Sequence, residues 1–324
     1  MGEATPFISI GMMAHNSARH IGEAIESVLA QDRGDWELLI SDDASTDGTG
    51  DVVHPYLADP RVSYVYQKDN LGQARNWWHL IVRARAPVFA RLDADDRWLP
   101  GTAAWMLETV ASGADVAIGG WKRVYESGAQ LVPEPRQHDG RMTGLEAYQR
   151  QCHVNTVLQG AMASRTSLAL HCGSPLPQLR YMVDFEYILR LMAASATVAS
   201  TEQVLLLYRV HASNETSAAQ RSLGYVLERP LLWEACQRHV TINPRVAGVL
   251  PQLRAALARN DFSDGLSEAV RRDRERGYSI MRDAALRCPE IARHPKVRAD
   301  LWLSGLGLPG YLMLRLLHSR RVRA

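Results

Sequence analysis

The first 125 residues alternate between two hydrophobic patterns. Short continuous apolar runs are typical of strands buried on both faces, and here they are separated by segments whose apolar residues recur every three or four positions, as in amphipathic helices. The runs that predict strands are FISIGMMA (7–14), WELLIS (36–41), VSYVY (62–66), PVFARL (87–92) and DVAIGGWKRVYE (115–126). The segments that predict helices are 21–29, 73–85 and 101–112. The alternation predicts a largely parallel sheet with helices on both faces, in which Asn16 or Ser17 caps the first helix.

Beyond residue 125 the pattern changes. The region 126–217 holds short helical patterns and one long apolar stretch, TVASTEQVLLLYRVH, that predicts a further strand or two. From 218 to 324 the periodicity is helical. We therefore expect a domain over 1–217, divided into halves at 1–125 and 126–217, and a helical C-terminal region over 218–324.

Charge and cysteine content exclude several classes of protein. A formal net charge of +2 over 324 residues lacks the basic excess of nucleic-acid-binding proteins, so no nucleic acid partner is expected. The cysteines are far apart and form no C-x-x-C pair, which predicts neither a zinc site nor a disulfide framework. They are Cys152, Cys172, Cys236 and Cys288. No secretory signal and no apolar run long enough to span a bilayer is recognisable, which favours a cytoplasmic protein.

The C-terminal segment 301–324 combines apolar residues with a basic end. Its basic residues are Arg315, Arg320, Arg321 and Arg323. A segment of this kind could lie on an anionic membrane surface, which would make the protein peripheral at the cytosolic face. The alternative is a terminal helix that packs on the body of the protein and ends in a solvated basic tail.

Three polar clusters follow predicted strands. They are AHNSAR (14–19), SDDASTDGT (41–49) and DADD (93–96). Each cluster alone is compatible with an ordinary turn, but the carboxyl ends of parallel strands meet at one edge of a sheet, where ligands gather. Carboxylates at such an edge favour a divalent cation with a diphosphate completing its shell. The chain lacks both a G-x-x-x-x-G-K-[ST] loop and a G-x-G-x-x-G motif, which argues against a P-loop phosphotransferase and a dinucleotide-dependent dehydrogenase.

Four ordered motifs resemble one known family. They are the segment from FISIGMMAHNSARH to SDDASTDGT, then NLGQARN (70–76), ARLDADDRWLPG (90–101) and, more weakly, YMVDFEYILRL (181–191) followed by YRVH. In this order and spacing they are similar to the nucleotide-sugar glycosyltransferases of family 2. The resemblance implies an inverting enzyme with the GT-A fold, a Rossmann-like mixed but mostly parallel sheet flanked by helices, here with a C-terminal helical appendage. It assigns nucleotide-sugar binding to 1–125 and acceptor binding to 126–217.

The resemblance also implies a donor site and a metal site. It places the donor nucleotide against Ala14, His15, Asn16, Asp42, Asp43, Arg75 and Asp93. The family often has Thr-Tyr-Asn where this chain has Ala14-His15-Asn16, so the nucleotide base, in UDP, dTDP or GDP, stays open. A divalent cation, Mn²⁺ or Mg²⁺, is expected on Asp95 and His211, with Asp93 as a further candidate. Asp96 would support these residues or cap the helix that follows Pro100.

The same resemblance implies a catalytic base and a place for the sugar. Asp184 matches the aspartate that acts as the base, although Val183 stands where the family usually has Glu. An aspartate at the start of a helix is also a common N-cap. Trp98, Gly160 and Ala161 are candidates for contact with the donor sugar and acceptor, whereas packing in the core is the alternative for Trp98 and the expectation for Trp77 and Trp78.

Two other functions stay open. A sugar-phosphate nucleotidyltransferase is also α/β and metal-dependent, but MMAHNSARH lacks the glycines of its phosphate loop. A catalytically silent nucleotide-sugar-binding protein is favoured only by Val183. For a transferase, the acceptor would be a glycan or a lipid-linked molecule in surface polysaccharide, lipopolysaccharide or glycolipid biosynthesis, and the sequence does not choose among them.

Overall fold

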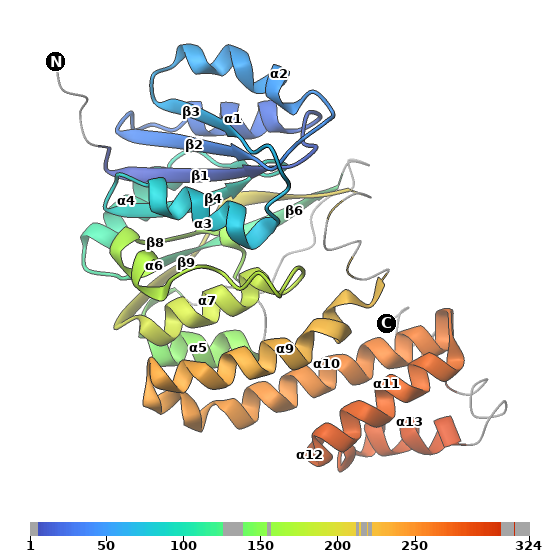
Figure 1. Ribbon diagram of the computed structural model, residues 1–324. Coiled ribbons are helices and arrows are strands. Elements are labelled where there is room, and N and C mark those ends of the chain that lie inside the picture. The colour runs from blue at the N-terminus through green and yellow to red at the C-terminus, as the bar shows by residue number, and fades with distance from the viewer. Residues whose placement is uncertain are drawn as a thin grey trace.

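The computed structural model describes residues 6–125, 139–153, 157–211, 214, 219, 222–305 and 314 of the chain. Within these residues one nine-stranded sheet forms the centre of the molecule (Figure 1). Its strands are β1 (Ile8–Ala14), β2 (Trp36–Asp42), β3 (Val62–Tyr66), β4 (Val88–Asp93), β5 (Arg97–Trp98), β6 (Val116–Tyr125), β7 (Gly140–Thr143), β8 (Met162–Arg165) and β9 (Thr197–Val210). The predicted strands of the first 125 residues are confirmed, and the mixed sheet confirms the GT-A fold class.

The sheet is parallel where the acidic clusters are. The strand order is β3-β2-β1-β4-β8-β6-β9-β5, with β7 paired to β9. β1 pairs in parallel with β2 and β4, and its register puts Ala14 opposite Asp42 and Met13 opposite Asp93. The carboxyl ends of these strands therefore end level with one another. β8 enters antiparallel between β4 and β6, which the sequence pattern does not predict.

The helices cover both faces of the sheet, as predicted. In the first half they are α1 (Ile21–Leu29), α2 (Thr49–Val53), α3 (Gln73–Arg83) and α4 (Thr102–Ala111). In the second half they are α5 (Gly144–His153), α6 (Thr166–Cys172) and α7 (Val183–Ala194). One detail is wrong: α1 begins after His20 without a side-chain cap, and the carbonyl of Ser17 accepts the amide of Ile21 instead.

Alternate residues of β4 point into two hydrophobic cores. Val88, Ala90 and Leu92 pack with α1 and α4, whereas Phe89 packs with α3 and α7. This is the two-residue period of a strand buried on both faces. We call the second side the α3–α7 face. Because the period is two, Arg91 and Asp93 lie on the α3–α7 face together with Phe89.

The C-terminal helices divide between two cores. They are α9 (Gly224–Arg238), α10 (Leu250–Arg271), α11 (Arg274–Arg287), α12 (Pro289–Ala292) and α13 (Pro295–Gly305) (Figure 1). Leu232 of α9 and Leu253 of α10 are fully buried in the core that contains α5 and α7. Each such leucine stabilises the fold by roughly 1.5–3 kcal/mol, so α9 is firmly attached to the domain. From Ala258 onward α10 packs with α11–α13 in a separate core.

Candidate active site

The carboxylates of the DADD turn face three different partners. The turn is closed by a hydrogen bond from the amide of Asp96 to the carbonyl of Asp93, 3.1 Å long. The side chain of Asp93 turns to Arg91, that of Asp95 to His211, and that of Asp96 into the protein, where its Oδ1 accepts the amide of Arg209 at 2.9 Å. This divergence keeps like charges apart.

Asp95 and His211 lie close enough to share a cation. His211 Nε2 is 3.0 Å from Asp95 Oδ2, and Asn214 donates to the same oxygen at 3.0 Å. Neighbouring ligands of an octahedral ion with bonds of about 2.1 Å are about 3.0 Å apart, so this pair fits such an ion. In the described part of the chain, no third His, Cys, Asp or Glu joins them to form a metal-binding group. Substrate oxygens would therefore have to complete the shell.

Asp96 supports the turn from inside. It is only 2% exposed, and burial together with the charges of Asp95 and Asp93 raises its pKa well above the usual value. It does not cap the helix after Pro100, because the N-cap residue of α4 is Gly101 and no side chain caps this helix. Of the two roles expected for Asp96, support of its neighbours is the one that the structure shows.

Arg91 fixes the carboxylate of Asp93. Its Nε and Nη2 donate to Oδ1 and Oδ2 of Asp93 at 2.9 and 3.0 Å, a two-pronged contact that matches the planar guanidinium. The guanidinium is 3% exposed and lies over the ring of Trp77, 4.4 Å from its centroid. Asp93 keeps about a third of its side chain exposed, so it can still face a ligand.

The residues expected at the nucleotide base form a connected loop system. His15 Nδ1 lies 2.7 Å from the carbonyl of Asp43, and the side chain of Asn16 accepts the amide of Thr46 at 2.9 Å. His15 and Asn16 are exposed, whereas Ala14 is buried at the end of β1, where its carbonyl accepts the amide of Asp43. His15 and Asn16 are therefore available to a ligand, and Ala14 could contribute only through its position beneath them.

The two neighbouring aspartates after β2 have different surroundings. Asp43 accepts the amides of Leu71 (2.6 Å) and Gly72 (3.0 Å), and Gly72 has the positive φ that glycine tolerates. Asp42 is fully buried, and its oxygens accept Ser45 N and the hydroxyl of Tyr64. Both oxygens of Asp42 therefore hold the loop, which favours a supporting role for this residue over direct contact with a nucleotide.

Arg75 is an open cation beside this loop. It lies in the first turn of α3, exposed to solvent, and makes no hydrogen bond or ion pair with other described residues. An exposed guanidinium close to the amino end of a helix is well suited to anionic oxygens.

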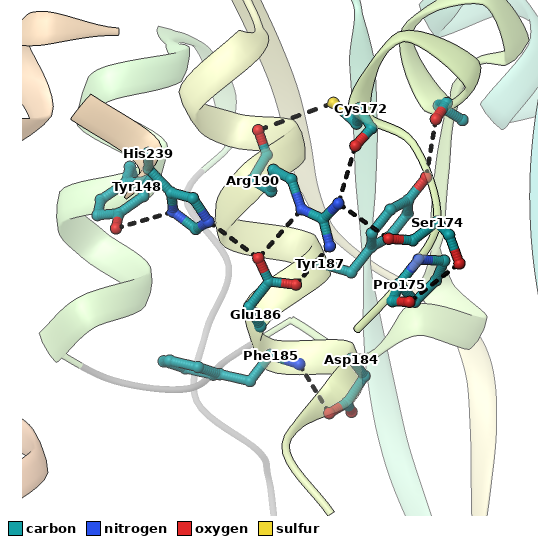
Figure 2. Close-up of polar contacts among 11 residues, drawn as sticks. Tyr148, Cys172, Ser174, Pro175, Asp184, Phe185, Glu186, Tyr187, Arg190 and His239 are labelled. Atoms are coloured by element: carbon teal, nitrogen blue, oxygen red, sulfur yellow. Dashed lines mark hydrogen bonds and ion pairs between the residues drawn. The ribbon is translucent and has the colours of Figure 1, made fainter. Parts of the chain in front are cut away.

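Asp184 lies in the first turn of α7, as its sequence position predicted (Figure 2). Its Oδ1 accepts the amide of Phe185 at 2.7 Å. Burial raises the pKa of this carboxyl, the positive charge of Arg91 opposes that rise, and the negative charge of Asp93 adds to it. The start of α7 packs in the same core as Phe89, on the face of β4 that carries Arg91 and Asp93.

A buried network holds the rest of α7 (Figure 2). Glu186 binds Arg190 on one side, and its Oε1 lies 2.9 Å from Nε2 of His239, which in turn contacts the hydroxyl of Tyr148. At the start of the helix, the carboxylate of Glu228 in α9 accepts three successive amides, those of residues 180–182, at 2.8–3.0 Å. The C-terminal region therefore anchors the segment that carries Asp184 at two points.

Two candidates for substrate contact lie beneath the surface. Trp98 is 3% exposed and its indole donates to the carbonyl of Gly160 at 2.7 Å. Ala161 is fully buried. Both side chains pack in the interior, which for Trp98 favours the alternative of core packing. Gly160 is also buried, and a Cβ there would meet Leu206 at 3.1 Å, which accounts for glycine by close packing.

The family model described as "Glycosyl transferase family 2" matches residues 9–170, which is half of the chain. The chain belongs to glycosyl transferase family 2. The curated relatives of this glycosyltransferase include the succinoglycan biosynthesis protein ExoO of Rhizobium meliloti, 37% identical over 119 residues, 36% of this chain and 33% of ExoO. For three other curated relatives the match spans 29–37% of their length.

Solved structures share the fold of this glycosyltransferase. S. aureus TarS in complex with UDP-GlcNAc has a TM-score of 0.71 at 17% identity, covering 97% of this chain and 91% of TarS. The mannosyltransferase PcManGT from Pyrobaculum calidifontis, in complex with GDP-Man and Mn²⁺, has a TM-score of 0.58 at 15% identity, covering 97% of this chain and 87% of that protein. At these identities the likeness shows the fold alone.

The sequence did not indicate three residues of the candidate site. Arg91 holds Asp93, Arg209 holds Asp95 and Asp96 through its guanidinium and its amide, and Asn214 joins Asp95 to His211. For Arg91 a signal was available, because a charged residue inside a buried strand needs a partner and Asp93, two positions on, shares its face.

The C-terminal segment 301–324 is described only at residues 301–305 and 314. No helix among the described residues is both long and apolar enough to cross a membrane. The four arginines after Leu314 lie outside the described residues.

Proposed function

We propose that this family 2 glycosyltransferase is a metal-dependent, inverting enzyme that transfers a sugar from a nucleoside-diphosphate sugar to an acceptor hydroxyl. The observation that carries the proposal is the arrangement of Asp93, Asp95 and Asp184. Asp93 is fixed and partly exposed, Asp95 meets His211, and Asp184 begins α7, which packs on the face of β4 that carries Asp93.

The donor would bind along the carboxyl edge of β1, β2 and β4. His15, Asn16 and Asp43 would face the base, Asp93 the ribose, and Arg75 the diphosphate. A divalent cation held by Asp95 and His211 would neutralise negative charge on the diphosphate as it leaves. PcManGT, which shares the fold, was solved with Mn²⁺, and carboxylate ligands suit Mn²⁺ or Mg²⁺.

Asp184 would act as the general base. It takes the proton of the acceptor hydroxyl while that oxygen forms a bond to the anomeric carbon, and the bond from this carbon to the diphosphate oxygen breaks with its electron pair. Attack from the side opposite the diphosphate inverts the configuration. A raised pKa suits a base, because proton transfer is most effective when the pKa lies nearer the working pH.

The replacement of the family's usual Glu by Val183 does not favour a silent binding protein. Val183 is 1% exposed and packs in the core, so this side chain is not in the site. The buried ionic contacts that α7 needs are supplied by Glu186, one turn later.

We propose that the donor binds in 1–125, the acceptor in 126–217, and that the helical region 218–324 supports α7. The relative named for succinoglycan biosynthesis favours a glycan or lipid-linked acceptor in surface polysaccharide synthesis. Peripheral contact with a membrane through the C-terminus remains part of the proposal. Flotation with anionic liposomes should recover the full chain and not a chain that ends before Leu301, and equal recovery would contradict it.

The test is a thermal-shift panel of UDP-, GDP- and dTDP-sugars with and without Mn²⁺. One donor should raise the melting temperature, since a ligand at 100 times its Kd adds about 2.7 kcal/mol to the free energy of unfolding. The Asp95→Ala variant should lose the metal-dependent part of the shift. Pyrophosphate release from a nucleoside triphosphate would instead identify a nucleotidyltransferase and contradict the proposal.

A further inference from the structure

Arg91 is a buried cation that pairs with Asp93 and stacks on Trp77, which in turn packs against α7. We propose that Arg91 is a positioning residue for both Asp93 and Asp184: it fixes the carboxylate of Asp93 through both oxygens, and its positive charge, held over Trp77 on the α3–α7 face, favours the ionised form of Asp184. The inference rests on the proposed function, in which Asp93 meets the donor and Asp184 is the base.

The contact with Arg91 fixes the orientation of the Asp93 carboxylate as well as balancing its charge. Two parallel hydrogen bonds of 2.9 and 3.0 Å leave the carboxylate no freedom to rotate about its own axis. The backbone of Arg91 belongs to β4, which pairs with β1 in the central part of the sheet. A lysine at this position would keep the charge and lose the second prong.

The contact with α7 runs through two aromatic rings. The guanidinium of Arg91 stacks on Trp77, and the ring of Trp77 packs edge-on against Tyr187 with the centroids 4.7 Å apart. Tyr187 is three residues after Asp184, so the two side chains lie on the same side of α7. Trp77 therefore lies between Arg91 and the turn of α7 that follows Asp184, and no ion pair joins Arg91 to Asp184 among the described residues.

One nitrogen of Arg91 is left over. Nη1 is buried and has no hydrogen-bond partner among the described residues. Buried donors are nearly always paired, so an unpaired one at this place needs an explanation. Among the charges that act on Asp184, that of Arg91 lowers its pKa and that of Asp93 raises it. Glu186 on the same helix is occupied by Arg190 and His239.

The chain contains a matched control. Arg61 forms the same kind of two-pronged contact with Asp59, at 3.0 and 2.6 Å, and its guanidinium lies 3.8 Å from the ring centroid of Trp36. Arg61 precedes β3 at the opposite, amino end of the strands. Arg61→Gln therefore removes an equivalent cluster without touching the site.

The decisive experiment needs no substrate. The full chain is labelled with ¹³Cγ-aspartate, the signal of Asp184 is assigned by its loss in Asp184→Asn, and its titration is followed by NMR. We expect the midpoint to move to higher pH in Arg91→Gln, to stay near the wild-type value in Arg91→Lys, and to be unchanged in Arg61→Gln. An identical midpoint in wild type and Arg91→Gln would overturn the effect of the Arg91 charge on Asp184.

A second measurement separates the effect of the two-pronged contact with Asp93 from the effect of the positive charge. Binding of UDP-GlcNAc and GDP-Man with Mn²⁺ is measured by calorimetry for wild type, Arg91→Lys and Arg61→Gln. Arg91→Lys should bind about tenfold more weakly, because the second prong to Asp93 is lost, whereas Arg61→Gln should match the wild type. Equal affinity in Arg91→Lys would overturn the fixing of Asp93, and it does so even if Arg91→Gln fails to fold.

The two proposals fail in different ways. If neither donor binds the wild type, the proposed function is contradicted for these two sugars. The titration of Asp184 then still tests the role of Arg91. If the donors bind but Asp184 titrates independently of Arg91, the proposed function stands and the shared role of Arg91 is overturned.

Discussion

Two arginine–aspartate–tryptophan clusters lie at opposite ends of the same sheet. Both pair an arginine with an aspartate two residues away, and both place the guanidinium over an indole whose own N–H is buried without a partner in the described part of the chain. In the Arg61 cluster the arginine is 36% exposed and its third contact is the carbonyl of Gly34. In the Arg91 cluster the arginine is 3% exposed, and Nη1 has no such contact.

The difference between the clusters is their position relative to the strand ends. The Arg61 cluster lies where the strands begin, against a loop, and its exposed ion pair is worth little in high dielectric. The Arg91 cluster lies where β4 ends, at the turn that carries Asp95, and its indole packs against Tyr187 of α7. The same set of side chains can therefore close a loop at one end and organise a site at the other.

The largest expected effect is on turnover. Asp93→Asn keeps the shape of the side chain but removes the charge that Arg91 holds, and we expect turnover to fall by about 100-fold or more, as for other lost positioning contacts. Asp59→Asn should leave turnover within about twofold, since it alters only the loop before β3. Steady-state kinetics of both variants with the donor from the panel measure this. Equal losses would mean that the clusters do not differ in function.

A smaller difference is expected in stability. Arg91→Gln leaves Asp93 partly exposed but removes a buried ion pair, and we expect the free energy of unfolding to fall by about 1–3 kcal/mol. For Arg61→Gln we expect about 0–1 kcal/mol, because that pair is more exposed. Urea denaturation of the two variants and the wild type measures these free energies of unfolding. A larger loss in Arg61→Gln than in Arg91→Gln would contradict the prediction.

The base itself should cost stability. Burial raises the pKa of Asp184 in the folded chain above its unfolded value, so the ionised form lowers the free energy of unfolding at neutral and higher pH. This penalty disappears as the pH falls below the unfolded pKa. Asp184→Asn should therefore melt about 1–3 °C above the wild type at pH 8, and the gap should shrink as the pH is lowered. A gap that is constant with pH would count against a raised pKa.

The smallest difference concerns the indoles. Trp77→Phe and Trp36→Phe both weaken a cation–π contact that is worth about 0.5–2 kcal/mol and remove an unpaired buried N–H. We expect similar, small losses of stability from the two. Only Trp77→Phe should also reduce turnover, by a few-fold, because Trp77 lies between Arg91 and Tyr187. Melting curves and steady-state kinetics of the two variants test this prediction.

The architecture near the amino end could be predicted because its signals are local. Buried parallel strands and amphipathic helices have their own hydrophobic periods, and the predicted strands and helices of residues 7–125 appear in the structure. β8 was missed because four residues, Met162–Arg165, carry no period, and it forms only by pairing with β4 and β6, which are distant in sequence.

Within the site, residue type was easier to predict than side-chain direction. The resemblance indicated Asp93, Asp95, His211 and Asp184, and the structure brings Asp95 and His211 together. The sequence could not show that Asp42 and Trp98 turn inward, because a buried supporting residue and a ligand-facing one occupy the same positions in a motif. The role of Arg91 was missed although strand alternation placed it beside Asp93.

The central claim is that Asp184 is the base of a site whose donor half is organised separately by Asp93. The most direct measurement is donor affinity and turnover in Asp184→Asn and Asp93→Ala, side by side with the wild type. We predict that Asp184→Asn binds the donor as the wild type does and loses 10²–10⁴-fold in turnover, roughly the contribution of a general base, whereas Asp93→Ala loses both. Wild-type turnover in Asp184→Asn would contradict the account.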